Sequence, residues 1–140
     1  MMHIDRFTAI YRNLDKHNLS SLEELYTEDV CFQDPAHILR GRQTLLRYFE
    51  QLYANVTSCR FAISSAHQDG DAGFVVWEMN LQHPSLNKGN AFTVHGCSHL
   101  LFRDGLVEFH RDYFDLGEML YERLPFIGRV VRKIKQRLGQ

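Results

Sequence analysis

Acidic and histidine side chains alternate with apolar ones near the end of the chain. His110, Asp112 and Phe114 fall at every second position, so they share one face of an extended strand. Asp34 stands directly before Pro35, where a shorter apolar segment ends. A carboxylate in apolar surroundings has its charged form disfavoured, which suits a general base, and a nearby histidine can shuttle a proton. The sequence therefore indicates Asp34, His110 and Asp112 as candidate acid–base residues.

The segments that must position these residues fall into two groups. Apolar residues at helical spacing predict helices over 3–16 and 42–54, with another beginning near residue 18 and a short strand over 30–34. The period then changes to two, and short polar turns separate four predicted strands: 57–67, 72–83, 90–103 and 106–115. Strands joined by such short turns pair antiparallel. We therefore expect an α+β fold with helices on one face of a curved sheet.

The composition is that of one globular domain with a sizeable core. The chain has 140 residues, of which 44% are hydrophobic and 24% charged. Its formal net charge of −1 gives no overall reason to expect a nucleic-acid partner. Aromatic residues reach 12%, and ten of them are Phe, which favours an apolar cavity.

The cysteines and histidines do not form a recognisable metal or cofactor motif. Cys31, Cys59 and Cys97 are far apart, so we interpret them as small buried side chains in a reducing compartment. His95, Cys97 and His99 alternate along one strand, but they lack a fourth ligand and belong to the back of the sheet. No phosphate-binding or dinucleotide-binding glycine motif is present. We expect no metal and no cofactor.

Targeting signals are equally weak in this sequence. The first residues lack a basic region followed by an apolar run, so no secretory signal is expected. No window approaches 18 consecutive apolar residues, so no membrane span is expected either. The prediction is a cytoplasmic protein.

Four short motifs resemble those of one known superfamily. They are Phe32-Gln33-Asp34-Pro35, Gly41-Arg42, Asp104-Gly105-Leu106-Val107 and the segment over 111–115. In their order and spacing they resemble the SnoaL-like branch of the nuclear transport factor 2-like superfamily, which includes ketosteroid isomerases, polyketide cyclases and limonene-epoxide hydrolases. The resemblance covers roughly residues 3–121. It implies a cone, in which a bent, largely antiparallel (mixed) sheet wraps around a pocket closed by N-terminal helices.

The isomerases and the hydrolases place different residues in that pocket. The resemblance gives Asp34 the position of the isomerase general base. It places one oxyanion donor at Ile10, next to Tyr11, and the second at Ser98. Asp112 matches the carboxylate of the epoxide hydrolases.

The partner residues of that hydrolase carboxylate are not present in this chain. In the hydrolases they form an Arg-x-Asp pair, which falls here near Met79 and Leu81. The chain therefore keeps one carboxylate from each scheme and completes neither.

These observations predict one cavity that holds the acid–base residues. We expect it to be lined by Tyr11, Phe32, Trp77, Met79, Val94, Ser98 and Phe114. The predicted function is acid–base chemistry of an isomerase, cyclase, dehydratase or hydrolase type on a small hydrophobic or lipid-like substrate. The alternative is a non-catalytic binding or scaffold protein. In that case Asp34 only caps a turn, and Asp112 belongs to a buried network with His110.

The face of the sheet opposite the pocket also carries large side chains. Weakly polar or aromatic residues at alternate positions would otherwise form an exposed patch. The residues concerned are His95, Cys97, His99, Phe109 and Tyr113. We therefore expect a homodimer packed through the back of the sheet.

The tail over 122–140 differs from the domain over 1–121. Residues 1–115 carry 10 basic and 15 acidic residues, or −5, whereas residues 116–140 carry 6 and 2, or +4. One apolar stripe follows the predicted helix: Ile127, Val130, Val131, Ile134 and Leu138. Basic residues occupy most of the remainder: Arg129, Arg132, Lys133, Lys135 and Arg137. The stripe either packs on a sheet, in its own or a partner subunit, or rests on anionic lipid. Nucleic acid is not expected, because no aromatic residues are interleaved with the charges.

Overall fold

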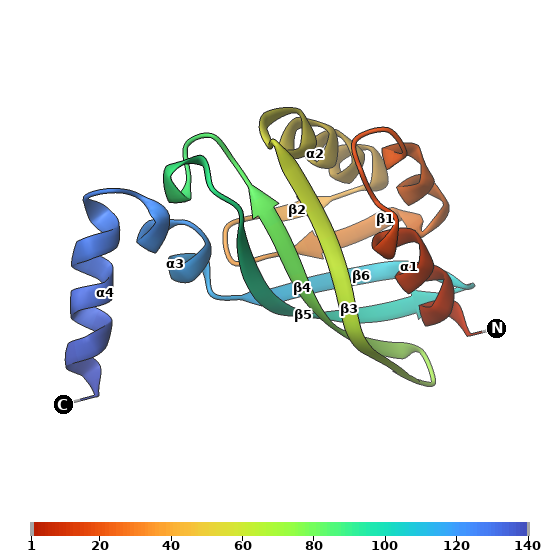
Figure 1. Ribbon diagram of the computed structural model, residues 1–140. Helices are drawn as coiled ribbons and strands as arrows, with labels where there is room; N and C mark the ends of the chain where they lie inside the picture. Colours follow the sequence, from red (N-terminus) through yellow and green to blue (C-terminus); the bar gives the residue numbers. More distant parts are fainter. Residues whose placement is uncertain (1, 140) are drawn as a thin grey trace.

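The computed structural model describes residues 2–139. Met1, the first residue of the predicted domain over 1–121, and Gln140, the last residue of the predicted tail over 122–140, lie outside the described residues. Six strands form one mixed sheet in the order β2-β1-β6-β5-β4-β3 (Figure 1). The strands are β1 (Tyr26–Gln33), β2 (Ile38–Arg40), β3 (Ser58–Asp69), β4 (Ala72–Gln82), β5 (Phe92–Arg103) and β6 (Leu106–Phe114). The long helices of the N-terminal half are α1 (His3–Arg12), beside β3, and α2 (Arg42–Asn55), beside β1. The predicted α+β architecture is confirmed.

The antiparallel meander of the second half is confirmed almost to the residue. β3, β4, β5 and β6 pair antiparallel in sequence order, with Gly70 and Gly105 at positive φ in the turns. The sheet then continues across a parallel pair, in which Phe32 of β1 lies opposite His110 of β6. This pairing joins residues far apart in the sequence, and it brings the end of β1 beside the candidate acid–base residues of β6.

The predicted N-terminal elements differ from the structure in their bounds. The first helix ends at Arg12 instead of residue 16, and a 3₁₀ helix, Leu19–Glu24, follows. Asn18 explains the early end: its side chain accepts from the Asp15 N–H at 2.8 Å and donates to the Asn13 carbonyl at 2.6 Å. Such local bonds compete with helical ones. β1 begins four residues before the predicted strand, and the short β2 was not predicted.

The sheet bends because three of its strands are irregular and one glycine admits a large ring. Register shifts occur in β3 between Ile63 and Ser65, in β6 between Val107 and Phe109, and in β1 between Tyr26 and Cys31, and irregularities of this kind increase local twist. On the concave face the Trp77 indole lies directly over Gly96. The concave face thus provides most of the core.

The C-terminal segment leaves the sheet through two short turns and ends in a separate helix. The elements are α3 (Leu116–Met119), a 3₁₀ turn (Tyr121–Arg123) and α4 (Ile127–Leu138), which stands away from the sheet in Figure 1. The alternative that its apolar stripe packs on the sheet of its own chain is wrong, since Ile134 is 55% exposed and Leu138 is 82% exposed. Among residues 2–139 no helix is long and apolar enough to cross a membrane.

We predict that Gly96→Ala destabilises the domain. The added methyl group would overlap the buried Trp77 ring, and overpacking of a core costs about 1–3 kcal/mol. Urea unfolding followed by circular dichroism measures the change. Gly139→Ala is the control, because its methyl group meets no close neighbour and the change should stay within about 0.5 kcal/mol. Equal stability of the two variants would contradict this account of the bend.

Candidate functional site

A cavity of about 170 Å³ opens between the concave face of the sheet and the helices α1, α2 and α3. Most of its wall is aromatic or aliphatic. Its more polar lining residues are Asp34, His37, Tyr48, Cys59, His83, Ser98, His110 and Asp112. An engineered apolar cavity of about 150 Å³ holds benzene. In this conformation the cavity therefore fits a molecule of about one ring.

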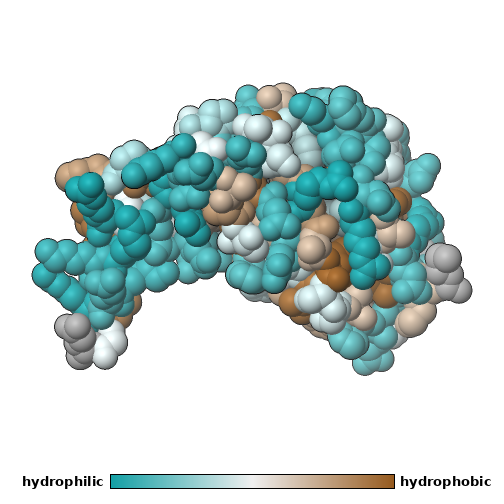
Figure 2. All heavy atoms as spheres, viewed as in Figure 1, coloured by the Kyte–Doolittle hydropathy of each residue, from teal (hydrophilic) through white to brown (hydrophobic). Residues whose placement is uncertain are grey.

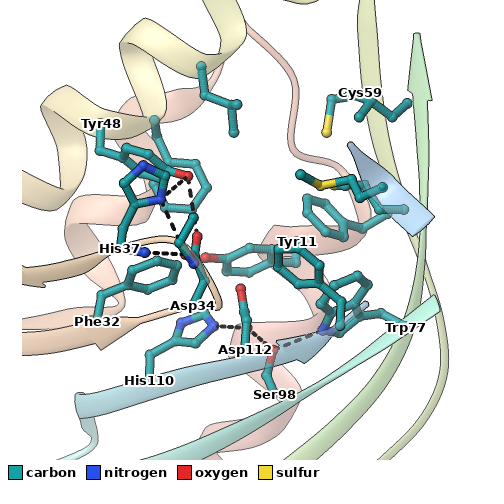
Figure 3. A pocket seen from close by; sticks show the side chains of 18 of the residues that line it. Tyr11, Phe32, Asp34, His37, Tyr48, Cys59, Trp77, Ser98, His110 and Asp112 are labelled. Atoms are coloured by element: carbon teal, nitrogen blue, oxygen red, sulfur yellow. Dashed lines mark hydrogen bonds and ion pairs between the residues drawn. The ribbon is translucent and has the colours of Figure 1, made fainter. Parts of the chain in front are cut away.

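Asp112 is held by one oxygen and presents the other to the cavity. Its Oδ1 accepts from the Ser98 hydroxyl at 2.5 Å and lies 2.6 Å from His110 Nε2. Ser98 in turn accepts from the Trp77 indole N–H at 2.8 Å. Oδ2 makes no hydrogen bond within residues 2–139, and Figure 3 shows the carboxylate pointing into the cavity toward Tyr11. The carboxylate is thus oriented by buried donors and remains accessible on one side.

A second chain of hydrogen bonds leads from His110 back to the cavity. His110 Nδ1 lies 2.9 Å from the Tyr26 hydroxyl, which lies 2.5 Å from the Tyr11 hydroxyl. His110 and Tyr26 are completely buried, and Tyr11 lines the cavity. Burial raises the pKa of both tyrosines far above the ordinary value, so both remain protonated phenols.

The hydrogen bonds from Asp112 through His110 and Tyr26 to Tyr11 can run in either of two directions, depending on how many protons His110 carries. With an ionised Asp112 and a neutral His110, the imidazole proton lies on Nε2, and Tyr26 donates to Nδ1 while Tyr11 donates to Tyr26. With His110 protonated on both nitrogens, Nδ1 donates to Tyr26, Tyr26 donates to Tyr11, and the Tyr11 O–H is free to point into the cavity. A proton on His110 therefore makes Tyr11 a hydrogen-bond donor for a ligand.

Asp34 lines the same cavity but has more partners than Asp112. Its Oδ1 accepts from the backbone N–H groups of Ala36 and His37 at 2.8 and 2.7 Å and lies 3.2 Å from His37 Nδ1. Its Oδ2 accepts from the Tyr48 hydroxyl at 3.3 Å. Asp34 thus caps the turn around Pro35, and its carboxylate also forms part of the cavity wall.

The structure brings together nearly all residues predicted for the site. The cavity lining includes Tyr11, Phe32, Asp34, Trp77, Met79, Ser98, His110, Asp112 and Phe114. Val94 is the exception: it is fully buried in the core opposite Met79 and does not line the cavity. It shares the concave face with Met79, its partner on β4, which does line the cavity.

Four site residues escaped the sequence interpretation. Tyr26 lies before the predicted strand, because β1 begins four residues ahead of the segment over 30–34. Tyr48 lies one turn after Leu45 on α2, so the helical period could have indicated it. Cys59 was interpreted only as a buried thiol, and His37 follows Pro35 in a loop with no periodic signal.

The histidines on the back of the sheet contact other side chains. Across the described residues, no group of three or more potential ligands is close enough to hold a metal ion. His95 pairs instead with Glu78 at 3.6 Å, and the His99 ring stacks on Phe74 with centroids 4.9 Å apart.

We predict that Ser98→Ala costs about 1–3 kcal/mol of unfolding free energy. The change leaves the buried Trp77 N–H without an acceptor and removes one donor from Asp112. Chemical denaturation followed by tryptophan fluorescence measures this cost. Ser64→Ala serves as the control, since the exposed Ser64 hydroxyl bonds only a strand carbonyl. If the two variants are equally stable, the hydrogen bonds of Ser98 are not structurally important.

We also predict that the Cys59 thiol resists alkylation at neutral pH. Burial raises its pKa to about 11, so the reactive thiolate is scarce until the pH approaches that value. Labelling with iodoacetamide, located by mass spectrometry, should accelerate about tenfold per pH unit between pH 8 and 10. Cys31, which is partly exposed, should react first. Rapid labelling of Cys59 at pH 8 would contradict the closed cavity wall.

Comparison with known proteins supports the fold and the family. No curated protein matches this sequence. A protein of Catenulispora acidiphila with a ketosteroid isomerase-like fold, in complex with trimethylamine, is 19% identical with a TM-score of 0.74, covering 88% of this chain and 93% of that one. A protein from Jannaschia that is provisionally described as a SnoaL-like polyketide cyclase is 12% identical with a TM-score of 0.73. The match covers 84% of this chain and 88% of that one.

An LEH-like epoxide hydrolase of M. tuberculosis is 19% identical with a TM-score of 0.70, covering 84% of this chain and 85% of that one. At these identities the likeness concerns the fold. The sequence profile of the SnoaL-like domain, however, matches residues 7–110, which is more than half of the chain. The protein therefore belongs to the SnoaL-like domain family.

Proposed function

We propose that the protein binds a small apolar carbonyl compound in its cavity and moves a proton on it, with Asp112 as the base. The observation that carries this proposal is the asymmetry of Asp112. Two buried groups hold Oδ1, while Oδ2 faces the apolar cavity. An oxygen without a protein partner is free to accept a proton from a bound molecule.

Each neighbour of Asp112 supports proton transfer in a distinct way. His110 and Ser98 fix the orientation of the carboxylate, so a bound molecule meets a positioned base. The apolar wall leaves Oδ2 as the acceptor that a bound apolar molecule meets. Tyr11 can then donate to a developing oxyanion when His110 carries a second proton. General acid–base help of this kind contributes about 10²–10⁴-fold in rate.

Epoxide hydrolysis is a weaker candidate for this site. The resemblance to the hydrolases requires an Arg-x-Asp pair where Met79 and Leu81 stand, and both of these side chains line the cavity. No arginine lines the cavity among the described residues. A base without an activating cation suits enolisation of a carbonyl compound better than opening of an epoxide.

A non-catalytic binding role is the second candidate. Asp34 supports the binding role, because both of its oxygens already have hydrogen-bond partners. These bonds hold the turn around Pro35 whether or not a ligand is bound. The histidine beside Asp112 also allows a purely structural network. The two candidates predict the same ligand and differ only in whether a proton moves.

Exchange of α-protons of cyclohexanone in D₂O, followed by NMR, separates these candidates. Wild-type protein should accelerate exchange, and Asp112→Asn should lower the rate about 10²–10⁴-fold, because it removes the base while keeping the shape. Binding, measured by quenching of Trp77 fluorescence, should remain. Asp71→Asn, in an exposed turn, is the matched control and should behave as wild type. Binding without exchange above buffer would contradict the enzyme and favour the binding role.

A further inference from the structure

We propose that α4 docks the protein on the surface of an anionic lipid bilayer. The proposal rests on the exposed apolar face of this helix, on how the rest of the chain holds it, and on its charges. It is independent of the chemistry proposed for the cavity.

The apolar face of α4 has no partner in the described part of the chain. The exposed fractions of Ile127, Val130, Ile134 and Leu138 are 48%, 46%, 55% and 82%, and Phe126 just before the helix is 78% exposed. Four of these side chains form a continuous stripe, because residues three and four apart are neighbours on a helix. Folding normally removes such a stripe from water. In Figure 2 hydrophobic atoms show at the outer margin of α4 around its hydrophilic side chains.

Other contacts fix which side of α4 faces outward. Gly128, the only buried residue of the helix, lies so close to the Glu122 backbone that a side chain would not fit. Lys135 pairs with Asp115 at 3.4 Å and with Glu122 at 3.1 Å, and Arg132 donates to the Glu122 carbonyl. These contacts lie on the flank beside the stripe, so they hold the helix while the stripe stays exposed to solvent.

The charges of α4 match an anionic surface. The helix contains five basic residues and no acidic one. Arg129, Lys133 and Arg137, four residues apart, form an exposed row beside the row of Val130, Ile134 and Leu138. None of the three basic side chains pairs with a carboxylate in the described residues. Insertion of the stripe would place this row at the level of lipid phosphates.

A second copy of the chain fits this face less well. Burying the stripe removes on the order of 400 Å², about half of what each partner contributes to a stable protein interface. Two α4 helices would repel each other through their basic rows. Outside the cavity, strands β4–β6 carry two carboxylates among the described residues, Glu78 and Glu108, and these already pair with His95 and Arg103.

The position of α4 connects the docking surface with the cavity. Leu116 and Met119 of α3 line the cavity, and α3 is joined through one short turn to α4. In Figure 1 α3 lies between the sheet and α4. Docking through α4 therefore brings the α3 side of the cavity toward the bilayer, where apolar molecules dissolve.

Co-sedimentation with vesicles tests the proposal. The full chain should pellet with vesicles of phosphatidylglycerol and phosphatidylcholine at low salt, be released as salt rises, and remain in solution with phosphatidylcholine alone. Val130→Glu with Ile134→Glu should lower partitioning at least about tenfold. Arg129→Gln, Lys133→Gln and Arg137→Gln together should lower it on the order of 100-fold.

A matched control is available on the sheet. Val76 is 44% exposed, like Val130 at 46%, so Val76→Glu adds one of the two charges at matching exposure and should bind vesicles as wild type does. Circular dichroism should show every variant folded, because all the changed side chains are at least partly exposed.

Three outcomes would overturn the proposal. The first is unchanged pelleting of the Val130→Glu, Ile134→Glu variant. In the second, sedimentation equilibrium shows a dimer for wild type and a monomer for this variant, and wild type does not bind vesicles. That result would make the stripe a subunit interface. In the third, wild type and the variant with the two glutamates bind duplex DNA and vesicles equally, and only the variant with the three glutamines loses this binding. That result would make α4 a general polyanion binder.

Discussion

The buried imidazole of His110 is the constraint on which the rest of the structure depends. A buried histidine needs a hydrogen-bond partner at each ring nitrogen, since an unsatisfied polar group inside a core costs about 1–3 kcal/mol. Here the partners are Asp112 at 2.6 Å and Tyr26 at 2.9 Å. One lies two residues away on β6, and the other lies at the start of β1. The core can therefore close around His110 only when β1 and β6 are paired in this register.

That pairing also explains why polar side chains gather around Asp112 in a largely apolar cavity. The polar side chains near Asp112 are tied to one another through Ser98 and Trp77 on one side and through Tyr26 and Tyr11 on the other. Asp34, His37 and Tyr48 form a second polar group that is bonded within itself, and most of the remaining wall is aromatic or aliphatic. A network whose members are nearly all satisfied positions its few reactive atoms without flexible loops. The free oxygen of Asp112 is the point at which this network meets a ligand.

The C-terminal helix is stabilised by different interactions from those that stabilise the domain. Packing determines the domain, whereas α4 is held mainly by the ion pairs of Lys135 and by the close approach of Gly128 to Glu122. Exposed ion pairs contribute little, about 0–1 kcal/mol each. The helix keeps its apolar stripe in water in the isolated chain, and an interaction with a bilayer would remove that cost. The apolar side chains of the domain thus face an internal cavity, whereas those of the tail face solvent.

Local pattern by itself determined much of this protein. The change from helical spacing to alternation near residue 57 predicted the four-strand meander, and alternation along β6 predicted that His110, Asp112 and Phe114 share a face. The stripe and charges of 127–138 predicted α4. Such features depend on residues close in sequence, whose side chains lie where the backbone period puts them.

Only the tertiary structure decided the partners of the site residues. The parallel pairing of β1 with β6, the chain from His110 through Tyr26 to Tyr11, and the absence of Val94 from the cavity wall all depend on segments separated by tens of residues. The solvent exposure of the α4 stripe also depends on the tertiary structure. Packing of the stripe on the sheet of its own chain would have fitted the sequence pattern equally well. Sequence spacing gives the direction of a side chain along its own element. The neighbour that it meets is set by packing and by the need to pair every buried polar group.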